Sequence, residues 1–303
     1  MNKSRKYFDP ETLATIRPLG LRAKTLIEGL VGGLHRSPQK GHSIEFAQHR
    51  EYVPGDDVRQ VDWKVYARSD RYYLKQYEDE TNLVCYLLVD HSESMEFRGQ
   101  QSSLNKLEYA QLIACSLAYL VTAQQDSAGL VTFSEKIDHW LPASSSSNLF
   151  EDFVSVLEQS SLSKRTDVSN VLSTVTQRLT RPSLIILLSD LFGNDDNGDA
   201  LMDAIRLLRC AGHDFMALHI LDSEEIDFPF DQVTDFEGLE VAGSIQTNPA
   251  LIATAYREAL ETFCQSVRVC CQQQNADYFR VRTDQTLLSS LPEILASRRI
   301  GGR

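Results

Sequence analysis

Asp90, Ser92 and Ser94 stand at alternate positions directly after an apolar run, where one carboxylate and two hydroxyls can face a single pocket. The run, residues 83–89, is rich in aliphatic and β-branched residues and predicts a strand buried on both faces. Ligand sites in open α/β sheets lie just beyond the carboxyl ends of such strands. Oxygen ligands of this kind suit Mg²⁺ or Mn²⁺ rather than zinc. Taken alone, the segment fits more simply a strand-to-helix turn in which Asp90 or Ser92 caps the next helix.

Two later segments supply another hydroxyl and another carboxylate. Thr166 precedes residues 168–179, in which apolar residues recur at helical spacing. Asp190 follows residues 184–188, a second apolar run that predicts a buried strand. In a doubly wound sheet the ends of two central strands and the start of the helix between them can be neighbours.

The ordered set D-x-S-x-S, Thr and Asp resembles the metal-ion-dependent adhesion site of von Willebrand factor type A domains. In that family the serines and the threonine contact the ion directly or through water, and the aspartates ligate it or hold its waters. One departure is the pair Lys164-Arg165, where family members usually have glycines before the threonine. The resemblance implies a site for Mg²⁺ or Mn²⁺ with the ligands Asp90, Ser92, Ser94, Thr166 and Asp190.

The residues upstream of this site are similar to the signature of the bacterial domain-of-unknown-function family fifty-eight. In that family the signature region directly precedes a type A domain. The resemblance covers the chain from about residue 15 to its C-terminus. Members of that family are commonly associated with MoxR-type AAA+ ATPases, so it implies such a partner. The matching motifs are Gly41-His42-Ser43-Ile44-Glu45-Phe46, the stretch from Arg50 to Trp63, Tyr77-Glu78-Asp79-Glu80, Asp235-Phe236-Glu237-Gly238 and Arg280-Val281-Arg282-Thr283-Asp284.

Strand and helix patterns alternate along the rest of the chain and predict a doubly wound, mostly parallel α/β sheet with helices on both faces. We expect residues 1–80 to form an N-terminal helix, over about 10–34, and a β-rich segment packed on the main domain. Residues 81–303 are expected to form the type A-like domain, with an acidic insertion at about 222–247 that contains a short hairpin. The upstream charged residues favour equally a buried ion-pair network and an exposed docking surface; they are Arg50, Asp56, Asp57, Arg59 and Asp62.

Charge and composition restrict the class of partner. The chain has 303 residues and a net charge of −12, and the acidic excess lies after residue 80. Because phosphate binding needs a basic face, this balance argues against nucleic acid as a ligand. The basic N-terminal arm and the arginine-containing C-terminal tail are candidates for contact with an anionic membrane or an acidic partner, with a solvated terminus as the simpler alternative. The given sequence shows no signal-peptide core and no transmembrane stretch, and its six cysteines have no zinc-like spacing. We therefore predict a cytoplasmic protein.

Other chemistries lack their motifs. The sequence contains no G-x-S-x-G elbow, no P-loop and no G-x-G-x-x-G. His91 lies inside the metal motif, and we expect it to point away from the ion toward the surface.

Hydroxyl ligands are neutral, so a divalent ion held by few carboxylates keeps positive charge and attracts an Asp or Glu of a protein partner. In the type A family this is the recognition mechanism, and the resemblance therefore implies a non-enzymatic, metal-dependent protein-interaction module. Two alternatives remain. One is a Mg²⁺-dependent hydrolase that uses Asp90, Asp190 and Asp167. The other is a structural type A domain whose metal site is unused.

Overall fold

The fold is known from a computed structural model, which describes residues 45–53, 61–69, 71–78, 83–146, 148–160, 162, 165–192, 199–230, 234–237, 244–287, 290–291 and 294. The predicted N-terminal helix and most of the charged upstream cluster lie outside the described residues. The chain divides into two compact units, and one of them comprises residues 34–82. The described residues from Leu83 onward belong to the other, which we call the main unit.

The main unit is built on a six-stranded sheet whose strand order is β10-β7-β6-β3-β4-β5. All neighbouring pairs are parallel except β4 and β5, so β5 is an antiparallel edge strand. This order confirms the predicted doubly wound, mostly parallel sheet. The strands are β3 (Val84–Asp90), β4 (Ser127–Phe133), β5 (Ile137–Ser144), β6 (Leu184–Ser189), β7 (Asp214–Leu221) and β10 (Asp277–Arg282).

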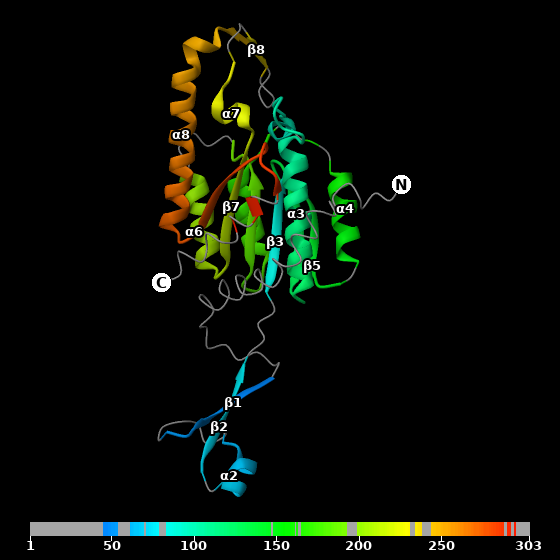
Figure 1. Ribbon diagram of the computed structural model, residues 1–303, viewed down its shortest axis with the longest axis vertical. Helices are drawn as coiled ribbons and strands as arrows, with labels where there is room; N and C mark the ends of the chain where they lie inside the picture. The colour runs from blue at the N-terminus through cyan, green and yellow to red at the C-terminus, as the bar shows by residue number, and fades with distance from the viewer. Residues whose placement is uncertain are drawn as a thin grey trace. The chain divides into compact units, whose positions relative to one another are not determined.

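Helices cover both faces of the sheet, as Figure 1 shows. One face packs against α3 (Lys106–Ala123) and α4 (Leu149–Gln159), and the other against α5 (Val168–Arg178), α6 (Asp199–Cys210) and α8 (Pro249–Gln273). Alternation along β3 feeds both cores, because Leu87 packs on the α3 side and Leu88 on the α5 side. The apolar runs that predicted buried strands, residues 83–89 and 184–188, therefore do form strands that are buried on both faces of the sheet.

Helix starts carry the caps that their sequences supply. Asn105 and Glu108 form a capping box at the start of α3, with the Glu108 amide donating to Asn105 Oδ1 at 2.7 Å. Asp167 caps α5 by accepting from the Asn170 amide at 3.0 Å. The end of a strand and the cap of the next helix together define the loop that joins them. They therefore determine where the polar residues of that loop lie.

Three short elements lie between the main strands and helices. A 3₁₀ turn, η3 (Glu93–Glu96), follows β3, and a five-residue helix, α7 (Ser223–Asp227), follows β7. The acidic segment after β7 contains the predicted hairpin, formed by β8 (Thr234–Glu237) and β9 (Ser244–Thr247). Helix α7 was not predicted, because five residues are too few for a helical repeat to show in the sequence.

The smaller unit pairs β1 (Glu45–Glu51) with β2 (Tyr73–Glu78) in antiparallel register. Between them lies a short helix, α2 (Trp63–Ser69), which the sequence did not predict. Asp62, from the charged upstream set, is buried and accepts from the Lys64 amide at 2.9 Å, as a helix cap does. Tyr66 stacks on Tyr72 at 4.5 Å between ring centroids, so this aromatic pair packs within the unit.

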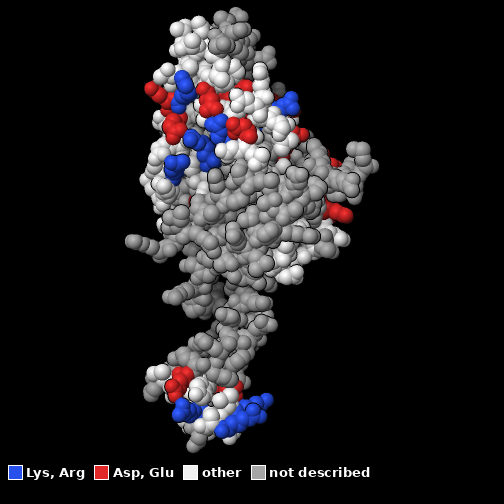
Figure 2. Space-filling model, viewed as in Figure 1, with Lys and Arg blue, Asp and Glu red and all other residues white. Residues whose placement is uncertain are grey.

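Acidic and basic side chains are interspersed over the described part of the main unit that Figure 2 shows. Several are paired, among them Arg280 with Glu261 and Arg282 with both Asp227 and Asp284. None of the described helices has the length and apolar content needed to cross a membrane.

Candidate functional site

The candidate site lies where the direction of strand addition reverses. From β3 the chain continues to β4 on one side, whereas β6 pairs with β3 on the other, with Val89 opposite Leu188. In open α/β sheets the crevice at such a point, beyond the carboxyl ends of the strands, is the usual ligand site. Asp90 ends β3 and Asp190 directly follows β6, so both carboxylates emerge there.

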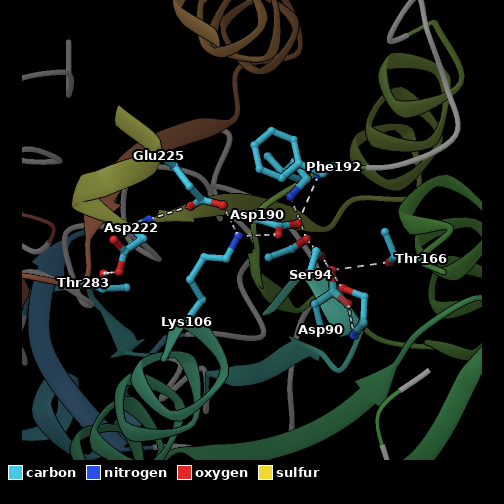
Figure 3. Close-up of polar contacts among 12 residues, drawn as sticks. Asp90, Ser94, Lys106, Thr166, Asp190, Phe192, Asp222, Glu225 and Thr283 are labelled. Carbon is cyan, nitrogen blue, oxygen red and sulfur yellow. Dashed lines mark hydrogen bonds and ion pairs between the residues drawn. The ribbon is translucent and has the colours of Figure 1, made fainter. Parts of the chain in front are cut away.

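Asp90 is the centre of the cluster and is completely buried. Its Oδ1 accepts from the Ser92 amide at 2.9 Å, and its Oδ2 accepts from Ser189 Oγ at 2.6 Å and Thr166 Oγ1 at 3.3 Å. Figure 3 shows Asp90 and Thr166 facing one another from different parts of the chain. Within the described residues, these hydrogen bonds to Asp90 all come from neutral donors.

The two serines of the motif lie side by side, with 3.0 Å between Ser92 Oγ and Ser94 Oγ. The 3₁₀ turn η3 produces this arrangement, since the Met95 amide donates to Ser92 O at 3.1 Å and bends the chain directly after the strand. Thr166 is brought in by its neighbour Asp167, whose amide donates to Ser134 O at the end of β4 (3.1 Å). All five predicted residues thus gather at this switch point: Asp90, Ser92, Ser94, Thr166 and Asp190.

Sequence reasoning missed Ser189, which makes the shortest contact to Asp90. Its Oγ also accepts from the Leu191 amide at 2.9 Å, so it fixes both the carboxylate and the turn after β6. The only signal was its place at the end of an apolar strand, immediately before a predicted ligand.

Sequence reasoning also missed Lys106, a completely buried lysine at the start of α3. Its Nζ donates to Asp190 Oδ2 at 2.8 Å and to Glu225 Oε1 at 2.7 Å (Figure 3). A cation in the first turn of a helix interacts unfavourably with the helix dipole. This unfavourable position was the one feature of the sequence that indicated an acidic partner for Lys106. Its partners lie 84 and 119 residues away in sequence, so no local pattern identifies the pairing.

The polar cluster continues from Glu225 to the ends of β7 and β10. Glu225 Oε2 accepts from the Asp222 amide at 2.7 Å. The Asp222 carboxylate accepts from Ser102 Oγ and Thr283 Oγ1, each at 2.7 Å. Side chains following four parallel strands are therefore joined along one edge of the sheet, as the dashed contacts in Figure 3 indicate in part.

Burial and neighbouring charges together set the protonation of these groups. Burial first, and then the nearby Asp190 carboxylate, raise the pKa of Asp90 to about 7. For Lys106 burial works to lower the pKa, but Asp190 and Glu225 outweigh it and hold the pKa above its usual value. Lys106 is therefore charged at neutral pH, whereas Asp90 is protonated in part of the molecules, because its neighbours only partly stabilise a buried charge.

The expected surface position of His91 is wrong. The residue is completely buried, and burial lowers its pKa to about 4. Its Nδ1 donates to Val89 O at 3.3 Å and Gln111 Nε2 donates to its Nε2 at 3.4 Å. The surface position fails because α3, which carries Gln111, covers this end of β3.

The donor set fits a small divalent cation. It offers two carboxylates and three predicted hydroxyl ligands, and one of the carboxylates is buried with neutral hydrogen-bond donors. The described residues hold no group of three or more His, Cys, Asp and Glu side chains suited to a metal ion. A cation here would consequently depend on the hydroxyls, which is the chemistry of a hard ion such as Mg²⁺.

Comparison with known proteins places the chain in a family. The family described as protein of unknown function DUF58 matches residues 48–267, which is more than half of the chain. This chain belongs to the DUF58 family. The DUF58 match begins in β1 and ends in α8, so it contains all five candidate ligands as well as Lys106 and Glu225.

Relatives of this DUF58 protein include uncharacterized mycobacterial proteins. Mb1516 of Mycobacterium bovis and Rv1480 of Mycobacterium tuberculosis are each 25% identical to it, over 97% of this chain and 92% of theirs. Among solved structures, conserved hypothetical protein BatB from Bacteroides thetaiotaomicron is similar, with a TM-score of 0.49, 18% identity and coverage of 72% of this chain and 100% of BatB. The SpRpn10 VWA domain has a TM-score of 0.41, with 10% identity and coverage of 71% and 95%.

Proposed function

We propose that this chain is a non-enzymatic protein-interaction module whose binding depends on a divalent metal ion, Mg²⁺ or Mn²⁺. The observation that carries the proposal is the buried cluster at the switch point, in which hydroxyls from three segments surround the Asp90 carboxylate. Asp90, Ser92, Ser94, Thr166 and Asp190 would hold the ion. When bound, such an ion supplies a positive charge that attracts an acidic side chain of a partner.

The residues around the site limit how much negative charge they contribute. Three of the five candidate ligands are neutral hydroxyls, and the charge of Asp190 is shared with the Lys106 ammonium. Asp90 is the carboxylate left to meet the ion without a cationic hydrogen-bond donor among the described residues. The ligands would therefore neutralise only part of the charge of a divalent ion. This supports a site that binds the ion and still attracts one carboxylate of a protein partner.

The contacts of the nearest candidate bases support a binding role over hydrolysis. Asp167, which a hydrolase would need close to a bound water, instead caps α5. His91 is held between Val89 O and Gln111, and its lowered pKa makes it a weak base. Asp167 and His91 are thus both engaged in the fold.

The proposed partner is a MoxR-type AAA+ ATPase, for which the chain would act as an adaptor. This assignment, like the cytoplasmic location, comes from the family resemblance and stays a prediction. The acidic balance of the main unit does not oppose it, because the partner would meet the bound ion rather than the protein surface alone.

The test is affinity capture with the full chain from lysate of its native host, in Mg²⁺ and in EDTA, followed by mass spectrometry. We expect an ATPase to be held only in Mg²⁺, and the capture to be lost in Asp90→Ala and Ser92→Ala. Asp203→Asn, an exposed change on α6, is the matched control and should capture normally. Capture that is unchanged in both site variants contradicts the metal-dependent mechanism.

A further inference from the structure

Lys106 fills a position that has the surroundings of a cation site. Its ammonium is completely buried and lies 2.8 Å from Asp190 Oδ2 and 2.7 Å from Glu225 Oε1. Two aromatic rings face it as well, with the Phe192 centroid at 5.3 Å and the Phe97 centroid at 5.9 Å. The lysine stem reaches in from α3, whereas the carboxylates follow β6 and β7, so a tethered cation joins three elements.

This tethered cation sets the net charge beside the candidate metal site. Asp90, Asp190 and Glu225 contribute three carboxylates, and Lys106 contributes one ammonium. When all four are charged, three negative charges and one positive charge leave a net charge of about −2 beside the ion. Without Lys106 the net charge of these side chains would be about −3, and Asp190 Oδ2 and Glu225 Oε1 would lose their cationic partner.

Hydrogen bonds also limit how the carboxylates can coordinate. Lys106 holds Asp190 Oδ2, and the Phe192 amide donates to Asp190 Oδ1 at 3.1 Å. Both oxygens of Asp90 accept hydrogen bonds as well. Ca²⁺ takes six to eight oxygens and favours bidentate carboxylates, whereas Mg²⁺ needs few carboxylates and keeps several waters. An arrangement in which each carboxylate oxygen already has a partner therefore disfavours Ca²⁺.

We propose that Lys106 is the specificity-determining residue of the site, acting as a built-in second cation that favours Mg²⁺ over Ca²⁺. The inference rests on the proposed function, because it requires that the site bind a divalent ion. Lys106 acts through Asp190 and Glu225, and so it is a positioning residue that does not itself contact the ion.

The experiment compares two substitutions that break the same ion pair but change the charge in opposite directions. Lys106→Met removes the positive charge and frees Asp190 Oδ2, so binding of both ions should tighten and the ratio of Ca²⁺ to Mg²⁺ affinity should rise roughly tenfold or more. Glu225→Gln removes a negative charge and leaves Lys106 to Asp190 alone, so binding should weaken roughly tenfold. A purely structural role would weaken binding in both variants.

Affinities for MgCl₂ and CaCl₂ are measured by isothermal titration calorimetry on the full chain after treatment with EDTA. Lys136→Met, at an exposed position between β4 and β5, is the matched control and should bind as the wild type does. Weaker binding in Lys106→Met, or an unchanged ion ratio, would overturn the inference while leaving the proposed metal dependence intact. A wild-type chain that takes up neither ion would overturn the proposed function and this inference with it.

Folding is followed in parallel, because removal of one partner from a buried ion pair is costly. We expect the thermal midpoint of Lys106→Met to be lower than that of the wild type in EDTA and to recover most of the difference in CaCl₂. If Lys106→Met does not fold in either buffer, Glu225→Gln decides alone. A ratio of Ca²⁺ to Mg²⁺ affinity below that of the wild type in that variant supports the inference, because a purely structural loss weakens binding of both ions alike, and an unchanged or higher ratio rejects it.

Discussion

Asp90 shows how burial and charge combine at a single residue. Its carboxylate is completely buried, and burial together with Asp190 raises its pKa to about 7. In the absence of a metal ion, part of the population therefore carries a proton on Asp90 at neutral pH. A bound cation would replace that proton. The buried carboxylate that destabilises the metal-free protein would therefore be the group that the ion stabilises most.

Asp90→Asn is predicted to abolish stabilisation by Mg²⁺ while preserving the fold. Asn has the same shape, and the neighbouring hydroxyls can reorient to accept from its amide, so the free energy of unfolding in EDTA should change by only about 1 kcal/mol. Thermal unfolding with and without MgCl₂ measures both effects, with Asp203→Asn as the exposed control. A midpoint that still rises with MgCl₂ in Asp90→Asn would show that the ion binds elsewhere.

Ser189→Ala is predicted to weaken ion binding although Ser189 was absent from the sequence-based ligand set. The change removes the 2.6 Å hydrogen bond to Asp90 and leaves the Leu191 amide without its Ser189 acceptor. We expect a loss of about 1–3 kcal/mol in the free energy of unfolding, measured by urea denaturation in EDTA. Calorimetry with MgCl₂ should show lower affinity as well, and wild-type values in both measurements would argue against this role.

At the scale of elements, sequence patterns predicted the centre of the sheet because β3 and β6 are built on uninterrupted apolar runs. The predicted buried strands at residues 83–89 and 184–188 correspond to β3 and β6, and the helical spacing over residues 168–179 corresponds to α5. Short elements escaped prediction, since α2 and α7 are too brief to show a repeat and are defined by caps such as Asp62 and Asp222. Their capping hydrogen bonds define where these helices begin, but the sequence pattern does not show which polar residues act as caps.

Gly99 is predicted to be intolerant of a side chain because it lies against the cap of α7. A Cβ at this position would overlap Asp222 Oδ1 and approach Glu224 Cγ to 2.9 Å. Gly99→Ala should displace the Asp222 carboxylate from the Glu224 amide and cost about 1–3 kcal/mol in the free energy of unfolding. Gln100→Ala is the control, since Gln100 is exposed and its backbone amide, which donates to Glu224 Oε1, is retained. Equal unfolding curves for the two variants would contradict the close packing.

At the scale of the whole molecule, the site is assembled from segments that are distant in sequence. Asp90, Thr166 and Asp190 were found because each follows or precedes a recognisable element. Lys106 and Glu225 were not, because their pairing depends on how α3 and α7 meet across the edge of the sheet. Motifs therefore predicted which oxygens gather at the switch point, whereas the positive charge that balances them required the three-dimensional fold.

Acid sensitivity follows from histidines that the fold buries. Burial lowers the pKa of His91 and of His219 to about 4, against 6.5 in an unfolded chain. Between these values the unfolded chain binds more protons than the folded one, so stability is complete above pH 6.5 and falls as the pH drops toward 4. Asp90 acts in the opposite direction in metal-free protein, because its raised pKa favours the folded state as the pH falls below 7.

His219→Gln separates these contributions. Glutamine does not titrate and retains a group that can accept from the Tyr278 hydroxyl, which lies 2.7 Å from His219 Nδ1. The loss in free energy of unfolding between pH 6.5 and 4 should be smaller than in the wild type by about 3 kcal/mol. Urea denaturation in EDTA across this range gives the two curves. Parallel curves would mean that His219 keeps its ordinary pKa, and that the apolar rings around it, Phe192 and Phe263, do not exclude a charged imidazole.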